Sequence, residues 1–177
     1  HNPGQRELPF CIHTRYSTQQ AILEDIVASL YAQGMRKLII LSGHGGNNFK
    51  GMIRDLAFVY PDFLIIAADW FSIVPPKDYF EAAVDDHAGE SETSVMMHYH
   101  PELVNLAEAG DGESQPFAIP SLNEKVGWAP RHWDKATVDS GVGNPQKASA
   151  EKGERYMKPV VEKLAKLFTE VGLGSLY

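Results

Sequence analysis

The sequence contains a single cysteine, Cys11, so the chain cannot form an internal disulfide bond. Because structural disulfides belong to oxidising compartments, this scarcity fits a reducing one, and we predict a cytoplasmic protein whose thiol is a small buried group. Runs rich in lysine and arginine are also lacking, and the formal net charge is −7, so we expect no nucleic-acid partner. No apolar run approaches the ~20 residues that span a bilayer, so we expect no membrane segment.

What the chain does contain is an ordinary apolar fraction arranged in short blocks. Hydrophobic residues make up 44 % of its 177 residues, which is enough for a normal core in one domain over residues 1–177. Two apolar runs, residues 38–41 and 63–67, alternate with helical patterns at about residues 17–33 and 48–59. Alternating helices and short apolar strands are typical of a parallel sheet, so we predict an α/β fold.

Capping and breaker residues set the expected ends of the first helix. Ser17 and Gln20 form a capping-box pattern that starts this helix, and Gly34 ends it. Its predicted buried stripe consists of apolar residues at helical spacing: Ile22, Leu23, Ile26, Val27 and Leu30.

The second half of the chain combines a long irregular stretch with one long helix. Residues 109–146 are rich in Gly, Pro, Ser and Asp and include Trp128 and Trp133, which predicts an excursion with one or two edge strands. Pro101 is expected to end a shorter helix that precedes this stretch. Residues 146–171 are predicted to form the last helix, with one apolar face: Tyr156, Val160, Val161, Leu164, Leu167 and Phe168.

The glycine-rich stretch after the first apolar run is the first candidate site. Residues 38–41 are followed at once by Ser42, Gly43 and His44, so the imidazole is predicted to lie just past the carboxyl end of a buried strand. Trp70 follows the second run and is expected at the same edge, where ligands bind in open α/β sheets. Imidazole is a common metal ligand. Two other interpretations stay open: an ordinary exposed turn, and a phosphate-binding loop, although the glycine spacing matches no established phosphate-loop pattern.

The acidic stretch at residues 84–94, VDDHAGESETS, is the second candidate site. It gathers four carboxylates and one histidine before a predicted helix. Glu90 or Glu92 offers a carboxylate ligand for a metal, although an acidic residue in a first helical turn also stabilises the helix dipole. His87 precedes two small residues that leave room for a substrate, so its imidazole is a candidate general acid or base.

Three segments together resemble the signatures of the creatininase family. SGHGGNN at residues 42–48 resembles the N-G-H-G-G-N signature, and DDHAGESETS at residues 85–94 resembles the second signature. SGVGNPQKASAEKG at residues 140–153 looks like a third family segment. The resemblance implies a three-layer α/β/α sandwich with a mostly parallel central sheet, assembled as a homohexamer. It also implies a pair of divalent metals (zinc, manganese or iron) that activate water to attack the C–N bond of a small-molecule substrate.

The same resemblance assigns roles to single residues. His44 and Glu92 would be metal ligands, and His87 would be the acid or base that handles protons at the reacting nitrogen. The remaining matched residues would bind substrate or shape the site: Asn47, Trp70, Asp86 and Gly89.

Two departures from the family pattern bear on the function. The pattern opens with a strand that carries a Glu-x-His ligand pair, and none precedes Ser42, so we expect a domain that is incomplete at its N-terminus. Gly46 stands where creatininase itself has a glutamate, which implies a substrate other than creatinine, such as a formamide, a peptide-like precursor or a cyclic sugar ketone. The alternatives are a catalytically inactive remnant or assembly subunit of the same fold and, less favoured, a nucleotide-binding module.

Overall fold

The computed structural model describes residues 4–6, 8–175 and 177, which divide into two compact units. Unit 1 comprises the described residues of His1–His13 and Pro75–Lys158, and unit 2 comprises those of Thr14–Val74 and Pro159–Tyr177. None of the helices in these residues is both long enough and apolar enough to cross a membrane. The organisation into one domain stays a prediction.

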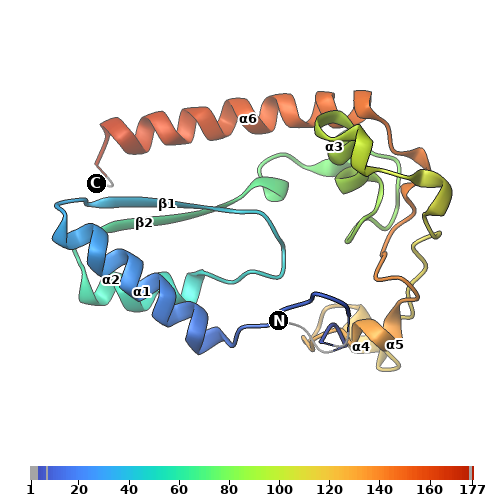
Figure 1. Ribbon diagram of the computed structural model, residues 1–177, viewed down its shortest axis with the longest axis horizontal. Coiled ribbons are helices and arrows are strands. Elements are labelled where there is room, and N and C mark those ends of the chain that lie inside the picture. The colour runs from blue at the N-terminus through green and yellow to red at the C-terminus, as the bar shows by residue number, and fades with distance from the viewer. Residues whose placement is uncertain (1–3, 7, 176) are drawn as a thin grey trace. The chain divides into compact units, whose positions relative to one another are not determined.

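Unit 2 contains the predicted parallel β–α–β arrangement. Its elements are α1 (Tyr16–Ala32), β1 (Lys37–Ser42), α2 (Lys50–Val59) and β2 (Leu64–Asp69). β1 pairs with β2 in parallel. In Figure 1, α1 and α2 lie on one side of this strand pair, and the C-terminal half of α6 (Ala150–Leu173) lies on the other. The α/β fold with parallel pairing is therefore confirmed. The larger central sheet of a three-layer sandwich stays a prediction, because the described residues form a sheet of two strands.

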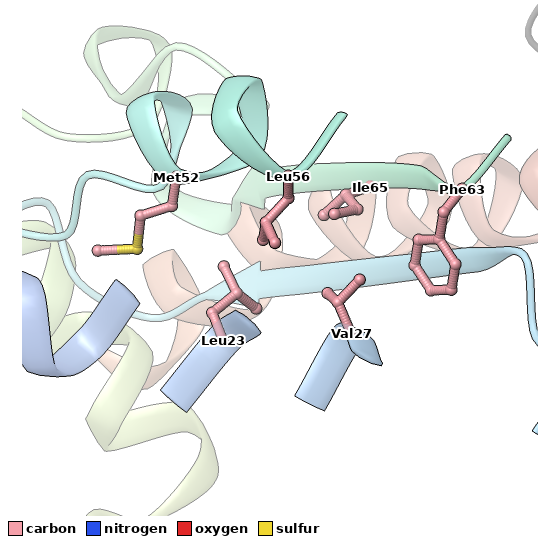
Figure 2. Close-up of a cluster of buried hydrophobic side chains, with 6 residues drawn as sticks. All are labelled: Leu23, Val27, Met52, Leu56, Phe63 and Ile65. Atoms are coloured by element: carbon pink, nitrogen blue, oxygen red, sulfur yellow. The ribbon is translucent and has the colours of Figure 1, made fainter. Parts of the chain in front are cut away.

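The core of unit 2 lies where α1 and α2 meet β2 (Figure 2). Six buried side chains form it: Leu23, Val27, Met52, Leu56, Phe63 and Ile65. The predicted stripe of α1 is wrong at Ile22 and Ile26, which are 54 % and 45 % exposed. Leu23 and Val27 are one helical turn apart on the buried face, whereas Ile22 and Ile26 each lie about 100° around the helix from them.

The two ends of α1 give opposite outcomes for the predicted helix signals. Gly34 ends the helix as predicted, because its N–H and the next N–H donate back to the carbonyls of Tyr31 and Leu30. The predicted capping box is wrong. The helix begins at Tyr16, and its N-cap residue, Arg15, makes no side-chain capping bond. The predicted capping serine therefore lies inside the first turn, where it cannot act as N-cap.

Unit 1 contains one ten-residue helix, the first part of α6 and several short turns. α3 (Glu90–Tyr99) ends before Pro101, as predicted. The short elements are η2 (Pro76–Asp78), η3 (Pro101–Leu103), η4 (Leu106–Glu108), α4 (Pro120–Asn123), α5 (Trp133–Ala136) and η5 (Pro145–Lys147). Cys11 is only partly buried, so the prediction of a buried thiol is wrong. Its Sγ lies 3.3 Å from Nε2 of His13, a polar neighbour that sequence position alone does not reveal.

The edge strands predicted within residues 109–146 do not form in the described part of the chain. This segment takes part in two isolated β-bridges instead. Ser114 pairs with Thr137 inside the segment, and Val142 pairs with His87 outside it. A longer ladder needs successive backbone donors, and this segment contains residues that lack one: Pro116, Pro120 and Pro130.

The last helix begins later than predicted. The side chain of Asn144 accepts a hydrogen bond from the N–H of Gln146 and starts η5, and Ala148 is then extended, so α6 begins only at Ala150. The helix buries one ridge at a spacing of four residues: Tyr156, Val160 and Leu164. Val161 and Phe168, which were also predicted on the buried face, lie beside this ridge and are exposed.

Candidate functional site

The carboxyl ends of β1 and β2 bring the first group of predicted site residues to one edge of unit 2. Ser42, the last residue of β1, is opposite Asp69, the last residue of β2. His44 follows the first strand and Trp70 follows the second, at the start of η1 (Trp70–Ser72). Trp70 Nε1 donates to the carbonyl oxygen of Gly43 at 3.4 Å. The predicted position of His44 and Trp70 at the strand ends is confirmed.

The turn of residues 42–48, called the glycine turn below, is held by short-range hydrogen bonds. The side chain of Asn47 donates to Oγ of the buried Ser42 at 3.4 Å, and its N–H donates to the carbonyl of His44 at 3.1 Å. The N–H of Gly46 donates to Nδ1 of His44 at 2.9 Å. Because Nδ1 accepts this hydrogen bond, it carries no proton itself, and the neutral imidazole has its proton on Nε2.

The segment of residues 85–92, called the acidic turn below, brings the second group together in unit 1. The N–H of His87 donates to the carbonyl of Val142 at 3.0 Å, and the N–H of Val142 donates back at 2.8 Å. Oε2 of Glu92 accepts the N–H of Ala88 at 2.7 Å and lies 4.0 Å from Nδ1 of His87. Both side chains are partly exposed, at 28 % for His87 and 39 % for Glu92. An imidazole and a carboxylate are thus neighbours at the start of α3.

The carboxylate of Asp85 caps α3 and occupies the space that a side chain at residue 89 would need. It accepts the N–H of Ser91 at 3.1 and 3.3 Å. A Cβ added at Gly89 would lie 2.2 Å from Oδ1 of Asp85, so any larger residue would displace the cap. Burial raises the pKa of Asp85 against the opposing effect of the Ser91 hydrogen bonds, and the nearby carboxylates of Glu90 and Glu92 add to the rise.

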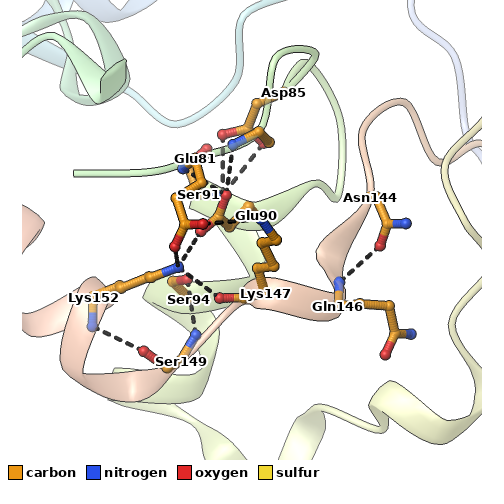
Figure 3. Close-up of polar contacts among 11 residues, drawn as sticks. Glu81, Asp85, Glu90, Ser91, Ser94, Asn144, Gln146, Lys147, Ser149 and Lys152 are labelled. Atoms are coloured by element: carbon orange, nitrogen blue, oxygen red, sulfur yellow. Dashed lines mark hydrogen bonds and ion pairs between the residues drawn. The ribbon is translucent and has the colours of Figure 1, made fainter. Parts of the chain in front are cut away.

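Glu90 anchors the acidic turn to α6 (Figure 3). Its fully buried carboxylate accepts the N–H groups of Glu81 and Ala82, both at 2.8 Å, and binds Nζ of Lys152 at 2.5 Å. Burial acts to raise the pKa of Glu90, but the hydrogen bonds from Lys152 and the backbone outweigh it, so the pKa is lowered. Because Glu90 is committed to these partners, Glu92 is the better of the two predicted carboxylate ligands.

Two more ion pairs complete this network on the solvent side. Lys147 and Lys152 both bind the exposed carboxylate of Glu81, at 2.9 and 3.0 Å. Hydrogen bonds from Lys147 and then Lys152 lower the pKa of Glu81 to about 2. The hydrogen bond from Glu90 is the main cause that raises the pKa of Lys152. Both lysines belong to residues 140–153, so this third sequence segment supports the second.

Two further residues near His87 were not singled out as site residues from the sequence. Nη2 of Arg131 lies 2.7 Å from Oδ2 of Asp86, and its guanidinium lies over the ring of Trp133, 4.8 Å from the centroid. The ring of Trp133 in turn contacts the ring of His87. Trp133 stood out in the sequence only as an aromatic in an irregular stretch, and no local pattern linked it to His87.

The predicted site residues therefore form two sets. His44, Asn47 and Trp70 lie in unit 2, whereas Asp86, His87, Gly89 and Glu92 lie in unit 1. Imidazole and carboxylate are the ligand types that zinc, manganese and iron accept, so the donor chemistry of His44 and Glu92 fits such a metal. A metal on Nε2 of His44 requires the ring proton on Nδ1, which would end the bond from Gly46. Within the described residues, no three His, Cys, Asp or Glu side chains form a group that could hold a metal ion.

Comparisons with known proteins agree on one family. The family model described as "Creatininase: Creatinine amidohydrolase" matches residues 1–168. The mycofactocin precursor peptide peptidase of Mycobacterium ulcerans (strain Agy99) is 32 % identical over 131 residues, which are 71 % of this chain and 45 % of that protein. The chain thus spans less than half the length of this curated relative.

Two crystal structures are similar to all or nearly all of the chain. That of "Putative creatinine amidohydrolase from Bacteroides fragilis NCTC 9343" is 83 % identical with a TM-score of 0.97, covering 100 % of this chain and 70 % of that one. That of creatinine amidohydrolase (creatininase) is 20 % identical with a TM-score of 0.72, covering 96 % of this chain and 71 % of that one. The second match shows a shared fold.

Proposed function

The chain belongs to the creatininase family, and on this basis we propose that the protein is a metal-dependent hydrolase that cleaves a C–N bond in a small polar amide. The observation that carries the proposal is the pairing of His87 with Glu92, 4.0 Å apart and both partly exposed at the start of α3. A general acid or base and a metal-binding carboxylate have to lie side by side in such a site.

In this proposal His44 and Glu92 hold the metal. When bound, divalent metals supply a water of lowered pKa and polarise the carbonyl of the substrate. His87 holds a proton on its ring and delivers it to the nitrogen that leaves. The bond from Ala88 N–H to Oε2 keeps the carboxylate of Glu92 turned back toward the start of the helix. Trp70, tied to Gly43, and Asn47, tied to Ser42, are the residues near His44 that we expect to contact the substrate.

The proposed substrate is an amide that differs from creatinine. The M. ulcerans relative is named for action on a precursor peptide, and Gly46 gives the glycine turn no carboxylate at the place where creatininase has one. Short peptides and formamides are therefore the first substrates to test, with creatinine beside them. The alternative, an inactive remnant or assembly subunit, requires that the purified protein bind no metal.

The first experiment measures divalent metal per chain by elemental analysis of the purified protein, with ring opening of creatinine to creatine and release of amine from a short peptide assayed in parallel. We expect about two metals per chain, the number in a paired-metal site. His44→Ala should lose metal, whereas His87→Ala should keep metal and lose turnover. His100→Ala, an exposed histidine after α3, is the matched control and should change neither. Full metal content in His44→Ala would refute the ligand assignment, and a metal content near zero in the unmodified protein would favour the inactive alternative.

The homohexamer implied by the family resemblance is part of the same proposal. Mass by light scattering at several concentrations tests it, and a monomer throughout would remove this part without touching the hydrolase assignment.

A further inference from the structure

The imidazole of His87 packs against a buried tryptophan from a distant part of unit 1. The ring centroids of His87 and Trp133 are 5.1 Å apart, with an interplanar angle of 70°, an edge-to-face arrangement that aromatic rings favour. The backbone of His87 is held by the same region, through its two hydrogen bonds with Val142. Both the main chain and the ring of His87 therefore depend on residues 131–142.

Trp133 is itself fixed by a contact that returns to the acidic turn. The guanidinium of Arg131 lies 4.8 Å from the centroid of the Trp133 ring, and Nη2 of Arg131 binds Oδ2 of Asp86 at 2.7 Å. Asp86 precedes His87 in the chain, so the four side chains form a closed circuit. A guanidinium suits this place, because it can stack on an aromatic face and bind a carboxylate at once.

We propose that Trp133 and Arg131 are positioning residues that fix the ring of His87 for proton transfer. The inference rests on the proposed function, in which His87 is the acid or base. A histidine on a turn can rotate about two side-chain bonds, and each rotation moves its nitrogens away from the reacting atom. The edge-to-face contact with Trp133 restricts that rotation, and the Arg131–Asp86 ion pair holds Trp133 to the same turn. Neither residue has to touch the substrate.

A plain packing role for Trp133 makes a different prediction. Trp133 is buried, so its removal costs stability under either explanation. Only the positioning role requires that the His87 ring move and that kcat fall while KM holds. The test therefore needs a variant that keeps an aromatic edge, a variant that removes it, and a readout of the His87 ring that does not depend on activity.

The experiment compares Trp133→Phe and Trp133→Leu in the full chain, with Trp128→Leu as control because Trp128 lies in the same irregular stretch and is 86 % exposed. Nuclear Overhauser signals between the imidazole C–H groups and the side chain of Glu92 report the position of the His87 ring, and the imidazole resonances are identified by their loss in His87→Ala. These signals depend on distance and not on the ring current of Trp133. We expect Trp133→Leu to weaken them, Trp133→Phe to retain most of their intensity, and Trp128→Leu to leave them unchanged.

Kinetics on the short peptide or on creatinine, whichever is hydrolysed, give the second readout. Trp133→Leu should lower kcat by about 10-fold to 100-fold, the range that a displaced catalytic group produces, with KM changed by less than about 2-fold. Arg131→Ala should lower kcat less than Trp133→Leu, and Trp133→Phe should restore most of it. Unchanged Overhauser signals between His87 and Glu92 in a folded Trp133→Leu protein would overturn the positioning role. If these signals weaken in Trp133→Leu but the unmodified protein hydrolyses neither substrate, the contact of Trp133 with the His87 ring is supported and the proposed function is refuted.

Discussion

The glycine turn and the acidic turn both carry predicted site residues, but they are held in different ways. The glycine turn is tied by bonds among its own residues and to Trp70, at 2.9–3.4 Å. The acidic turn is tied to residues far along the chain, through the buried Glu90–Lys152 pair, the backbone bridge to Val142 and the ring of Trp133. The second turn is therefore organised by the surrounding unit and the first mainly by itself.

This difference predicts that the two turns differ in how easily they can rearrange. A locally held glycine turn could exchange the bond between Gly46 and His44 if the imidazole bound the proposed metal, at small cost to the rest of unit 2. An acidic turn with many long-range partners keeps His87 and Glu92 in one arrangement, as the proposed proton transfer would require. We infer that the acidic turn is the pre-organised one of the two turns and the glycine turn the adaptable one.

The largest effect is expected at Glu90, because this residue joins the acidic turn to α6. Glu90→Ala removes a fully buried carboxylate and leaves the N–H groups of Glu81 and Ala82 without their acceptor. We expect the free energy of unfolding to fall on the order of 3 kcal/mol, the lower end for breaking a buried ion pair, since Lys152 keeps Glu81 as a partner. Urea denaturation at pH 7 measures this. If Glu90→Ala lowered the free energy of unfolding no more than the loss of a surface ion pair does, the acidic turn would not be held more strongly than the glycine turn.

A smaller effect is expected in the glycine turn. Asn47→Ala removes a long hydrogen bond of 3.4 Å to Ser42, so the free energy of unfolding should fall by only about 0.5 kcal/mol. Asn48→Ala, at the next residue, is the matched control in the same urea titration. If Asn47→Ala destabilised the protein as much as Glu90→Ala, the glycine turn would be no less integrated than the acidic turn.

The smallest effect is expected from the exposed part of the network, as a dependence on pH. The pKa of Glu81 is about 2 in the folded protein against an ordinary value of 4.5, so its contribution is complete above pH 4.5 and is lost as the pH falls from there toward 2. The raised pKa of Asp85 acts in the opposite direction, because the folded protein binds that proton more readily. The urea midpoint of Glu81→Gln should therefore decline less with acid than that of the unmodified chain.

Salt provides the check on this pH effect. Glu81 and its partner Lys147 are solvent-exposed, so 1 M NaCl should shrink the difference between Glu81→Gln and the unmodified protein. A difference that persisted in high salt would mean that this carboxylate is shielded from solvent.

The parts of the fold that the sequence predicted correctly are those with local signals. The two strands follow from short apolar runs, although each strand continues past its run, to Ser42 and to Asp69, and the end of α1 follows from Gly34. The start of α1 was missed because an extended Arg15 sets it without a side-chain cap. The exposure of Ile22 depends on which neighbours cover each face of α1, and periodicity alone cannot tell two adjacent apolar faces apart.

In the candidate site, too, local signals were predicted correctly and contacts between distant residues were not. Motifs located the glycine turn and the acidic turn, and the metal ligands and catalytic role that the resemblance implies stay predictions. The contacts that hold the acidic turn were not foreseen, because Glu90 and Lys152 are 62 residues apart and no spacing rule joins them. The contact between the rings of Trp133 and His87 was not foreseen either, because Trp133 lies in a segment that forms isolated bridges and no regular strand.

The long sequence separation between Glu90 and Lys152 affects the order in which parts of the protein can fold during synthesis. A growing chain that has just completed the acidic turn does not yet contain its counter-ion, which is 62 residues further on. The six core residues of unit 2 all lie between residues 23 and 65, so they are all available long before that lysine emerges. Closing the longer loop also costs more chain entropy. His87 and Glu92 are therefore expected to become ordered only after Lys152 of α6 has left the ribosome, later than these six core residues of unit 2.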